Sequence, residues 1–292
     1  MSDNPRVADI DDVMPGKPLG TKDLEVTPAN VHDHMASLGL PVSETGYAPF
    51  LLLGTEPWGW PGSYVEYWLG GVAQDMRWIS HAPVAIGTRL RAQAYVSDRY
   101  IVRNRECSVV TTDLFDEQGR LMLTGSGTYS ARVDPDTVRA DVPRREAVPK
   151  HDPAAGGLVR SGEPRTLRID REMSQMFWRH RPDIGTGNFH TSLEIAQSMG
   201  FADVLIGSSH LAAVAGEQAH ALLGDAWLAG GQLTTRFLKP VIGGDDVTVQ
   251  IDQFHGPDGG TLIQGKMTNQ RGETVLAIEG ELPSAPSDGR RL

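Results

Sequence analysis

The chain has 292 residues, of which 39% are hydrophobic and 22% charged, so it is long enough for two domains and apolar enough to bury a core. A formal net charge of −10 without basic clusters argues against a nucleic-acid partner, since phosphate backbones are bound by clustered Lys and Arg. The single cysteine, Cys107, excludes a disulfide framework and predicts a buried, inert thiol. Residues 1–12 lack the features of a signal peptide and no segment has membrane-spanning length, so we expect a cytoplasmic protein without a membrane partner.

The first half of the chain predicts a short strand, a helix and then several strands. The helix follows the run from Leu24 to Thr27, with Thr27 as its N-cap. Alternating apolar residues from Leu90 to Val96 predict a strand, and the turn residues from Asp116 to Gly119 predict a hairpin. Between the helix and these strands, the stretch from Tyr47 to Tyr67 is rich in aromatic and turn residues.

The second half repeats this order beyond a polar segment, residues 134–163, that reads as an exposed linker. Asp170 is its helix N-cap, the residues from Val247 to Ile251 alternate like a strand, and those from Asn269 to Gly272 form a hairpin signal. Residues 1–133 and 164–292 are therefore predicted to be two tandem units. Each unit is of the α+β class, with a curved antiparallel sheet wrapped around a helix.

Shorter landmarks also recur between the two units. These pairs are Trp68-Leu69-Gly70-Gly71 with Trp227-Leu228-Ala229-Gly230-Gly231, Arg77-Trp78 with Arg236-Phe237, and Pro83-Val84 with Pro240-Val241. The spacing is about 143 residues at the helix caps but about 159 at the Trp-Leu landmarks, so the second unit carries an insertion of about 16 residues. The interval holds a polar segment from Arg179 to Ser192 and an apolar helix from Leu211 to Leu223. We predict that a ligand binds where the two halves have diverged in this way.

The polar segment of the second unit contains a histidine motif built from His190, Ala196, Gly200 and Phe201. Their spacing resembles the downstream part of the pattern S-G-D-x-N-P-x-H-x-D-x-x-x-A-x-x-x-G-F of MaoC-like dehydratases and type-2 enoyl-CoA hydratases. Ser192 stands where this pattern has its second Asp. The run from Arg236 to Val241, followed by Gly244-Asp245, is similar to the R-F-x-x-P-V…G-D strand pair of the same family.

The resemblance implies a double hot-dog fold, in which two tandem units each wrap a curved antiparallel sheet around a central helix. It also implies an enzyme that adds or removes water at the double bond of an acyl thioester such as an enoyl-CoA. The thioester would be carried by CoA or by a carrier protein, and would be a substrate. We expect no metal and no redox cofactor, because His32 and His34 lie two apart on a helix and the glycines at 185 and 187 lack a dinucleotide fingerprint.

The chain departs from the family pattern at the catalytic aspartate, whose position is taken by Gly185. The nearest acid, Asp183, could reach His190 if Gly185 and Gly187 let the loop bulge by accepting positive φ. Otherwise the chain lacks the catalytic pair of aspartate and histidine that the family uses. The alternatives are then a thioester-binding protein without hydratase activity, or a different reaction in the same pocket, such as that of a thioesterase, isomerase or cyclase.

Hydration of a conjugated thioester needs a base for water, an acid for the α carbon and donors for the developing oxyanion. His190 suits the acid-base role, and a neighbouring carboxylate from Asp183 would fix its tautomer and orient it. The family resemblance places the oxyanion donors on the backbone where the central helix begins, at Gly207, Ser208 and Ser209.

The substrate pocket is expected to include Asn188 together with an aromatic cluster of the first unit, Trp58, Trp60 and Tyr64. The simpler reading of that cluster is a packed loop. A Ser/His nucleophile pair with His210 is rejected, because adjacent residues do not align for proton transfer and the G-x-S-x-G elbow is absent. Strands at a sheet edge favour pairing between chains, so we expect a homodimer.

Overall fold

The computed structural model describes residues 6–7, 14–42, 45–52, 63–64, 72–132, 141–146, 156–179, 187–256 and 259–284. The helices are α1 (Pro28–Ser37), α2 (Arg171–Trp178), α3 (Leu193–Ser198), α4 (Ser208–Leu223) and α5 (Ala226–Gly230). The strands of the first half are β1 (Arg6–Val7), β2 (Pro18–Glu25), β3 (Ser63–Tyr64), β4 (Val72–Ser80), β5 (Arg89–Val102), β6 (Arg105–Asp116) and β7 (Leu121–Arg132). Those that follow are β8 (Arg144–Arg145), β9 (Leu158–Ser161), β10 (Arg165–Ile169), β11 (Gln232–Phe237), β12 (Asp245–His255), β13 (Thr261–Asn269) and β14 (Thr274–Leu282).

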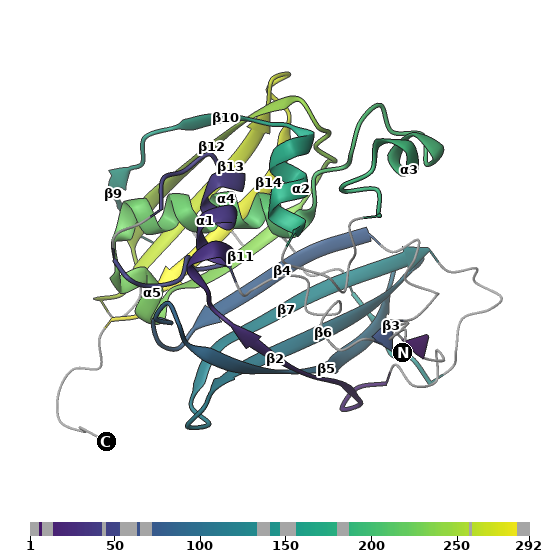
Figure 1. Ribbon diagram of the computed structural model, residues 1–292, viewed down its shortest axis with the longest axis horizontal. Helices are drawn as coiled ribbons and strands as arrows, with labels where there is room; N and C mark the ends of the chain where they lie inside the picture. The colour runs from purple at the N-terminus through teal and green to yellow at the C-terminus, as the bar shows by residue number, and fades with distance from the viewer. Residues whose placement is uncertain are drawn as a thin grey trace.

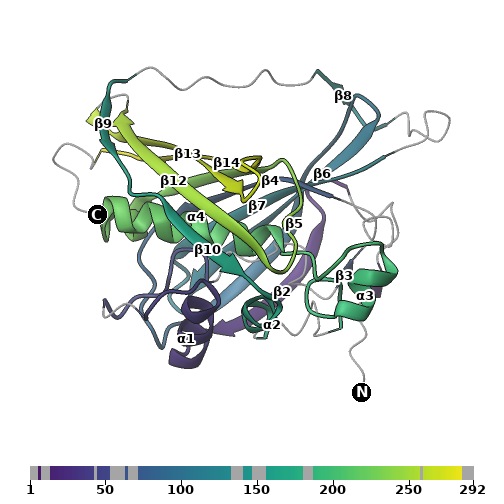
Figure 2. The same ribbon diagram turned by 90° about the horizontal axis from the view of Figure 1, so that it is seen from above.

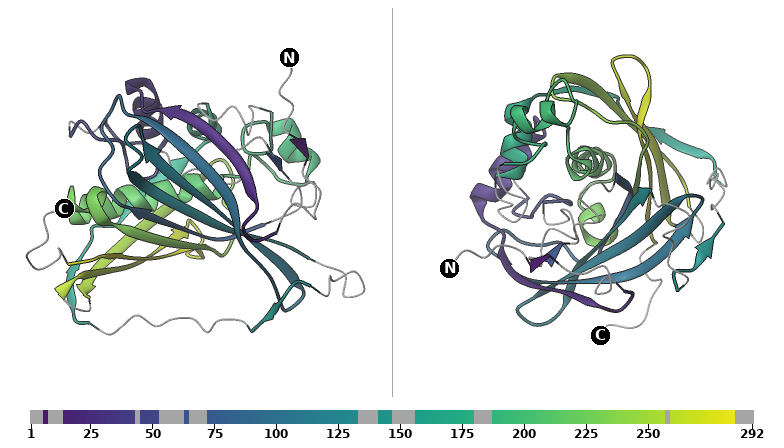
Figure 3. Two further views of the ribbon diagram at one scale, coloured as in Figure 1. Left: turned by 90° about the horizontal axis from the view of Figure 1, so that it is seen from below. Right: turned by 90° about the vertical axis from the view of Figure 1, so that its right-hand side faces the viewer.

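One 12-stranded sheet runs through both halves in the order β10-β12-β13-β14-β11-β4-β7-β6-β5-β2, with β9 beside β12 and β8 beside β5. The sheet curves around α4, which lies in its hollow (Figure 1). Seen end-on, α4 lies between strands of both halves on one side and α1 and α2 on the other (Figure 3). β1 and β3 form a separate parallel pair. The arrangement is the α+β double hot-dog architecture that the sequence predicts.

Both predicted helix caps are confirmed. The Thr27 hydroxyl accepts a hydrogen bond from the Asn30 amide N–H at 3.2 Å, and the Asp170 carboxylate accepts one from the Met173 N–H at 2.9 Å. Each bond satisfies a donor that the first turn of a helix leaves without an intrahelical acceptor. α1 and α2 therefore begin at corresponding points of the two units.

Both predicted hairpin turns are also confirmed, and they share one design. A carboxylate or amide oxygen, of Asp116 in one turn and Asn269 in the other, accepts from the backbone N–H groups two and four residues further on, at 2.8–3.1 Å. Gly119 and Gly272 occupy the left-handed position, with φ of 78° and 74°. A glycine is favoured there because a Cβ atom would clash with the backbone.

The two halves join where β4 pairs with β11. Asp75 lies opposite Arg236, and Arg77 lies opposite Thr234. A shift of about 159 residues exchanges these two pairs, as the internal repeat requires. The register therefore has the two-fold symmetry expected of duplicated units.

Matching hydrogen bonds show where the second unit carries its insertion. Ala48 N–H donates to the Val84 carbonyl at 2.8 Å, and Ile206 N–H donates to the Val241 carbonyl at 2.9 Å. Residue 206 thus corresponds to residue 48, about 158 further along, whereas the helix caps correspond at about 143. The extra residues therefore lie within 179–203, in the segment that carries His190 and α3, and not in α4.

α4 serves both halves of the molecule. It packs against the first-half residues Phe50 and Leu51, with an ideal Cβ on Gly216 only 3.3 Å from Leu51 Cδ1. The Glu217 carboxylate accepts a hydrogen bond from Phe50 N–H at 3.3 Å. The expected central helix is thus present in the second unit. Its counterpart in the first would begin near Phe50, in a range that falls mostly outside the described residues.

The predicted linker contains two short exposed strands. β8 pairs with β5 in parallel, and β9 pairs with β12 in antiparallel fashion. The domain boundaries at 133 and 164 remain a prediction. In the part of the chain that the structure describes, no helix is long and apolar enough to cross a membrane.

Candidate active site

The loop that carries His190 is fixed by hydrogen bonds to its backbone. Asn188 Oδ1 accepts from His190 N–H at 2.7 Å, a turn typical of asparagine. From α2, Ser174 Oγ donates to the His190 carbonyl at 2.8 Å, and Gln175 Nε2 donates to the Thr191 carbonyl at 2.9 Å. Asn188 therefore shapes this loop; its expected contact with substrate remains a prediction.

The imidazole of His190 has a defined tautomer. Its Nδ1 lies 2.6 Å from the Leu205 carbonyl oxygen, and a carbonyl can only accept, so Nδ1 carries the proton. Nε2 consequently holds a lone pair. Burial lowers the pKa of His190 to about 4, although the bond to Leu205 acts in the opposite direction. The ring is therefore neutral at pH 7, with Nε2 able to accept a proton.

This geometry corrects one role expected of Asp183. The sequence assigned to Asp183 the orientation of the imidazole and the choice of tautomer, but the Leu205 carbonyl occupies Nδ1 and performs both tasks. Asp183 itself lies outside the described residues. Any contact of its carboxylate with the Nε2 side of His190 remains a prediction.

Trp178 is the site residue that sequence reasoning missed. Its indole stacks on the His190 ring, with centroids 5.2 Å apart and planes 15° apart. The same indole touches Gly207, where an ideal Cβ would lie 2.5 Å from Cζ2. The signal in the sequence was a glycine directly before an apolar helix, but only the fold could show which side chain requires it.

The N-terminus of α4 provides backbone donors beside this indole. Gly207 is the N-cap, without a side-chain cap, and Ser208 and Ser209 are the first two residues of the helix. N–H groups at these positions have no acceptor within their own helix and lie at its positive end, so they favour an anion. Ser208 lies three positions after Leu205, a backbone path of at most about 11 Å. The start of α4 and the His190 ring thus contact the same indole. The oxyanion role of these donors remains a prediction.

The other pocket residues expected from sequence are not placed. Trp58 and Trp60 lie outside the described residues. Of Tyr64 only the backbone is described, in β3, where it pairs with Val7 of β1.

The segment between α3 and α4 is anchored from two sides. Arg171 of α2 binds the Asp203 carboxylate at 2.8 and 3.1 Å, and this contact lowers the pKa of Asp203. On the other side, Ile206 N–H donates to the Val241 carbonyl in the loop 238–244. The carbonyl of Leu205 is therefore held rigidly against His190.

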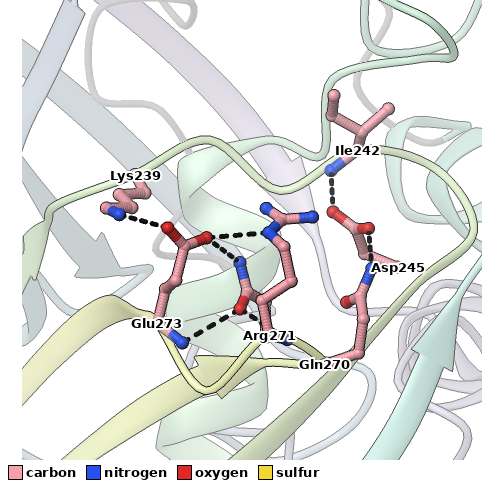
Figure 4. Close-up of polar contacts among 7 residues, drawn as sticks. Lys239, Ile242, Asp245, Gln270, Arg271 and Glu273 are labelled. Atoms are coloured by element: carbon pink, nitrogen blue, oxygen red, sulfur yellow. Dashed lines mark hydrogen bonds and ion pairs between the residues drawn. The ribbon is translucent and has the colours of Figure 1, made fainter.

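A polar cluster in turn anchors the loop 238–244 to the β13–β14 hairpin (Figure 4). The Asp245 carboxylate accepts from Ile242 N–H at 3.0 Å and from Gln270 Nε2 at 2.5 Å. Glu273 accepts from the side chains of Asn269, Lys239 and Arg271, which lower its pKa to about 2. The Gly-Asp of the second family motif thus supports the site from a distance.

Neither a protein-family model nor a curated protein matches this sequence. Solved structures do match over nearly the whole chain. A MaoC-like dehydratase from Phytophthora capsici is 16% identical with a TM-score of 0.65, covering 95% of this chain and 100% of that one. A second MaoC-like dehydratase is 14% identical, with a TM-score of 0.67 and coverage of 91% and 98%. HtdX of Mycobacterium tuberculosis is 17% identical, with a TM-score of 0.59 and coverage of 89% and 98%.

The same fold also occurs in a protein named as an oleoyl thioesterase from Lactobacillus plantarum, 9% identical with a TM-score of 0.55, over 92% of this chain and 97% of that one. The chain therefore has the double hot-dog fold of the MaoC-like dehydratases, as the motif resemblance implied. The fold alone does not decide the reaction, because one fold hosts several chemistries.

Proposed function

We propose that the chain is a hydratase or dehydratase that adds or removes water at the α,β double bond of an acyl thioester of the enoyl-CoA type. One observation carries the proposal: a neutral imidazole with its Nε2 lone pair available stands against the same indole as the N-terminus of α4. An acid-base group and a set of oxyanion donors are the two parts that this reaction requires.

In the hydration direction, a water molecule held at Nε2 of His190 attacks the β carbon. The water proton passes to Nε2, and the electrons of the double bond move toward the thioester carbonyl. The oxygen, now enolate-like, accepts hydrogen bonds from the N–H groups of Ser208 and Ser209. The α carbon then takes the proton from the imidazolium, which restores the neutral ring. Dehydration is the reverse sequence.

A partner for His190 would improve the first step. With a pKa near 4, Nε2 is a better proton donor to the α carbon than acceptor from water. A carboxylate beside the bound water would raise that pKa and help to hold the water. Asp183 is the proposed partner, in place of the family aspartate that Gly185 replaces.

A second candidate is a thioester protein without hydration chemistry, either a binding protein or a thioesterase. Gly185 at the aspartate position favours it, and a protein of the same fold is named as a thioesterase. The carrier of the acyl group and the expected homodimer remain predictions in either case.

The test is an absorbance assay at the enoyl-thioester band with crotonyl-CoA and a longer enoyl-CoA. We expect the wild type to hydrate one of them, and His190→Ala and Asp183→Asn each to lose about a hundredfold or more of kcat/KM. His32→Ala is the matched control, because the His32 side chain is 69% exposed and has no part in the proposed mechanism. A wild type that binds CoA thioesters but leaves the double bond untouched would favour the second candidate.

A further inference from the structure

We infer that His210 is a positioning residue, which sets the first turn of α4 so that its backbone N–H groups point at the thioester oxygen. The inference rests on the proposed function, because it assigns a device to the oxyanion donors of that site. His210 is the third residue of α4 and follows Ser208 and Ser209 directly.

The hydrogen bond of His210 crosses from one half of the molecule to the other. Its side chain is completely buried, and Nε2 lies 2.9 Å from the carbonyl oxygen of Ser37, the last residue of α1. Since a carbonyl only accepts, Nε2 carries the proton and donates it. The last carbonyls of a helix have no donor within that helix, so the contact also completes the end of α1.

Stacked rings connect His210 to the rest of the site. The imidazole lies flat on Phe177 of α2, with centroids 4.3 Å apart and planes 6° apart. Phe177 meets Trp178 edge-on at 5.4 Å, and Trp178 is the indole between His190 and Gly207. α1 and α2, which supply these contacts, lie side by side near the start of α4 (Figure 2).

The two contacts hold the first turn of α4 against two helices. Stacking on Phe177 fixes the His210 side chain against α2, and the bond to Ser37 fixes it against the end of α1. The N–H groups of Ser208 and Ser209 belong to the same turn, so their direction follows that of His210. A displacement of about 1 Å in such groups can cost about a hundredfold in rate.

The first half of the chain has no histidine at the position that corresponds to His210. By the matching hydrogen bonds, residue 52 corresponds to 210 and residue 49 to 207. These positions hold Leu52, which cannot donate from its side chain, and Pro49, which has no N–H group. The buried histidine is therefore a feature of the second unit and not of the fold as such.

The test compares His210→Leu, which removes the donor, with His210→Gln, whose Nε2 can still reach the Ser37 carbonyl. Arg165→Gln is the control, since Arg165 donates to the neighbouring carbonyls of Leu38 and Gly39 and its charge acts on Glu217 of α4, which lies outside the first turn. The probe is acetoacetyl-CoA, whose enolate absorbs in the near ultraviolet and is stabilised by correctly aimed oxyanion donors. Its absorbance is followed against pH, and kcat and KM are measured in parallel with crotonyl-CoA.

We expect the wild type, His210→Gln and Arg165→Gln to bind the probe as enolate at lower pH than it forms in free solution. His210→Leu is expected to lose this shift and to fall by about tenfold to a hundredfold in kcat, with a far smaller change in KM. A folded His210→Leu that retains the enolate shift and kcat overturns the inference. If that variant does not fold, His210→Asn, polar but too short to reach Ser37, takes its place.

The experiment distinguishes failure of the proposed hydratase function from failure of the inference about His210. A wild type that binds the probe as enolate but does not hydrate crotonyl-CoA contradicts the proposed function while the inference about His210 stands. A wild type that hydrates crotonyl-CoA, with a His210→Leu variant that behaves identically in both measurements, contradicts only the inference. A wild type that fails in both measurements contradicts both.

Discussion

Trp178 and His190 lie face to face, with ring centroids 5.2 Å and planes 15° apart, and the edge of the same indole fills the space beside Gly207. His190 and the start of α4 therefore both contact one side chain, the indole of Trp178. Any change that moves this indole should disturb both parts of the site together.

Gly207→Ala tests that shared contact. Gly207 has φ −65° and ψ 145°, which alanine adopts freely, so the effect would come only from the new methyl group, 2.5 Å from Trp178 Cζ2. Because such a contact is impossible, we expect a loss of about 1–3 kcal/mol in the free energy of unfolding and of at least about tenfold in activity. Urea denaturation and the enoyl-CoA assay measure the two effects.

The control is Gly157→Ala, since a Cβ at Gly157 meets nothing within 4 Å and its φ is not positive. Gly157→Ala should resemble the wild type in both measurements. A Gly207→Ala protein with the stability and activity of the wild type would show that the indole does not press on the helix start.

The half-buried His190 should make stability depend on pH. Its pKa is about 4 in the folded protein against 6.5 for the free group, so between these values the unfolded chain binds more protons. Stability is therefore expected to fall as the pH drops from about 6.5 to 4, and to lose no more from this group below 4. A tenfold difference in proton affinity is worth about 1.4 kcal/mol, which gives an upper limit of about 3.5 kcal/mol.

Urea denaturation of the wild type and of His190→Asn between pH 8 and pH 4 measures this contribution. Asparagine can still donate to the Leu205 carbonyl but does not titrate, so the variant should show a flatter profile in that window. Parallel pH profiles for the two proteins would contradict the assignment of a neutral imidazole with a lowered pKa.

The sequence predicted the local features of this fold much better than the long-range ones. Thr27 and Asp170 act as caps through residues three positions away, and the two hairpins depend on residues within one turn. By contrast, the pairing of β4 with β11 and the contact between Trp178 and Gly207 join residues far apart in sequence. The insertion was recognised from spacing, but its location within 179–203 required the matching bonds of the two halves.

Asp245→Ala should weaken the support of the site without touching its chemistry. The carboxylate accepts from Ile242 N–H and from Gln270, and its loss leaves the loop 238–244 less restrained. We expect a loss of about 1–2 kcal/mol in the free energy of unfolding. Asp246→Ala is the matched control, because the side chain of Asp246 is 47% exposed and lies 3.7 Å from Arg168. Equal stability of the two variants would show that the cluster in Figure 4 does not restrain the loop.

Thr235→Val should stabilise the protein. Thr235 is completely buried on β11, opposite Met76 of β4, where the two halves meet. Its hydroxyl has no hydrogen-bond partner among the residues that the structure describes. A buried hydroxyl without a partner costs about 1–3 kcal/mol, and valine has nearly the same shape, so we expect a gain of about 1 kcal/mol and a higher Tm. The neighbouring Thr234→Val, on the opposite face of the same strand, should change stability by less than about 0.5 kcal/mol. A destabilised Thr235→Val would mean that this hydroxyl does form a hydrogen bond, and that this bond stabilises the junction of the two halves.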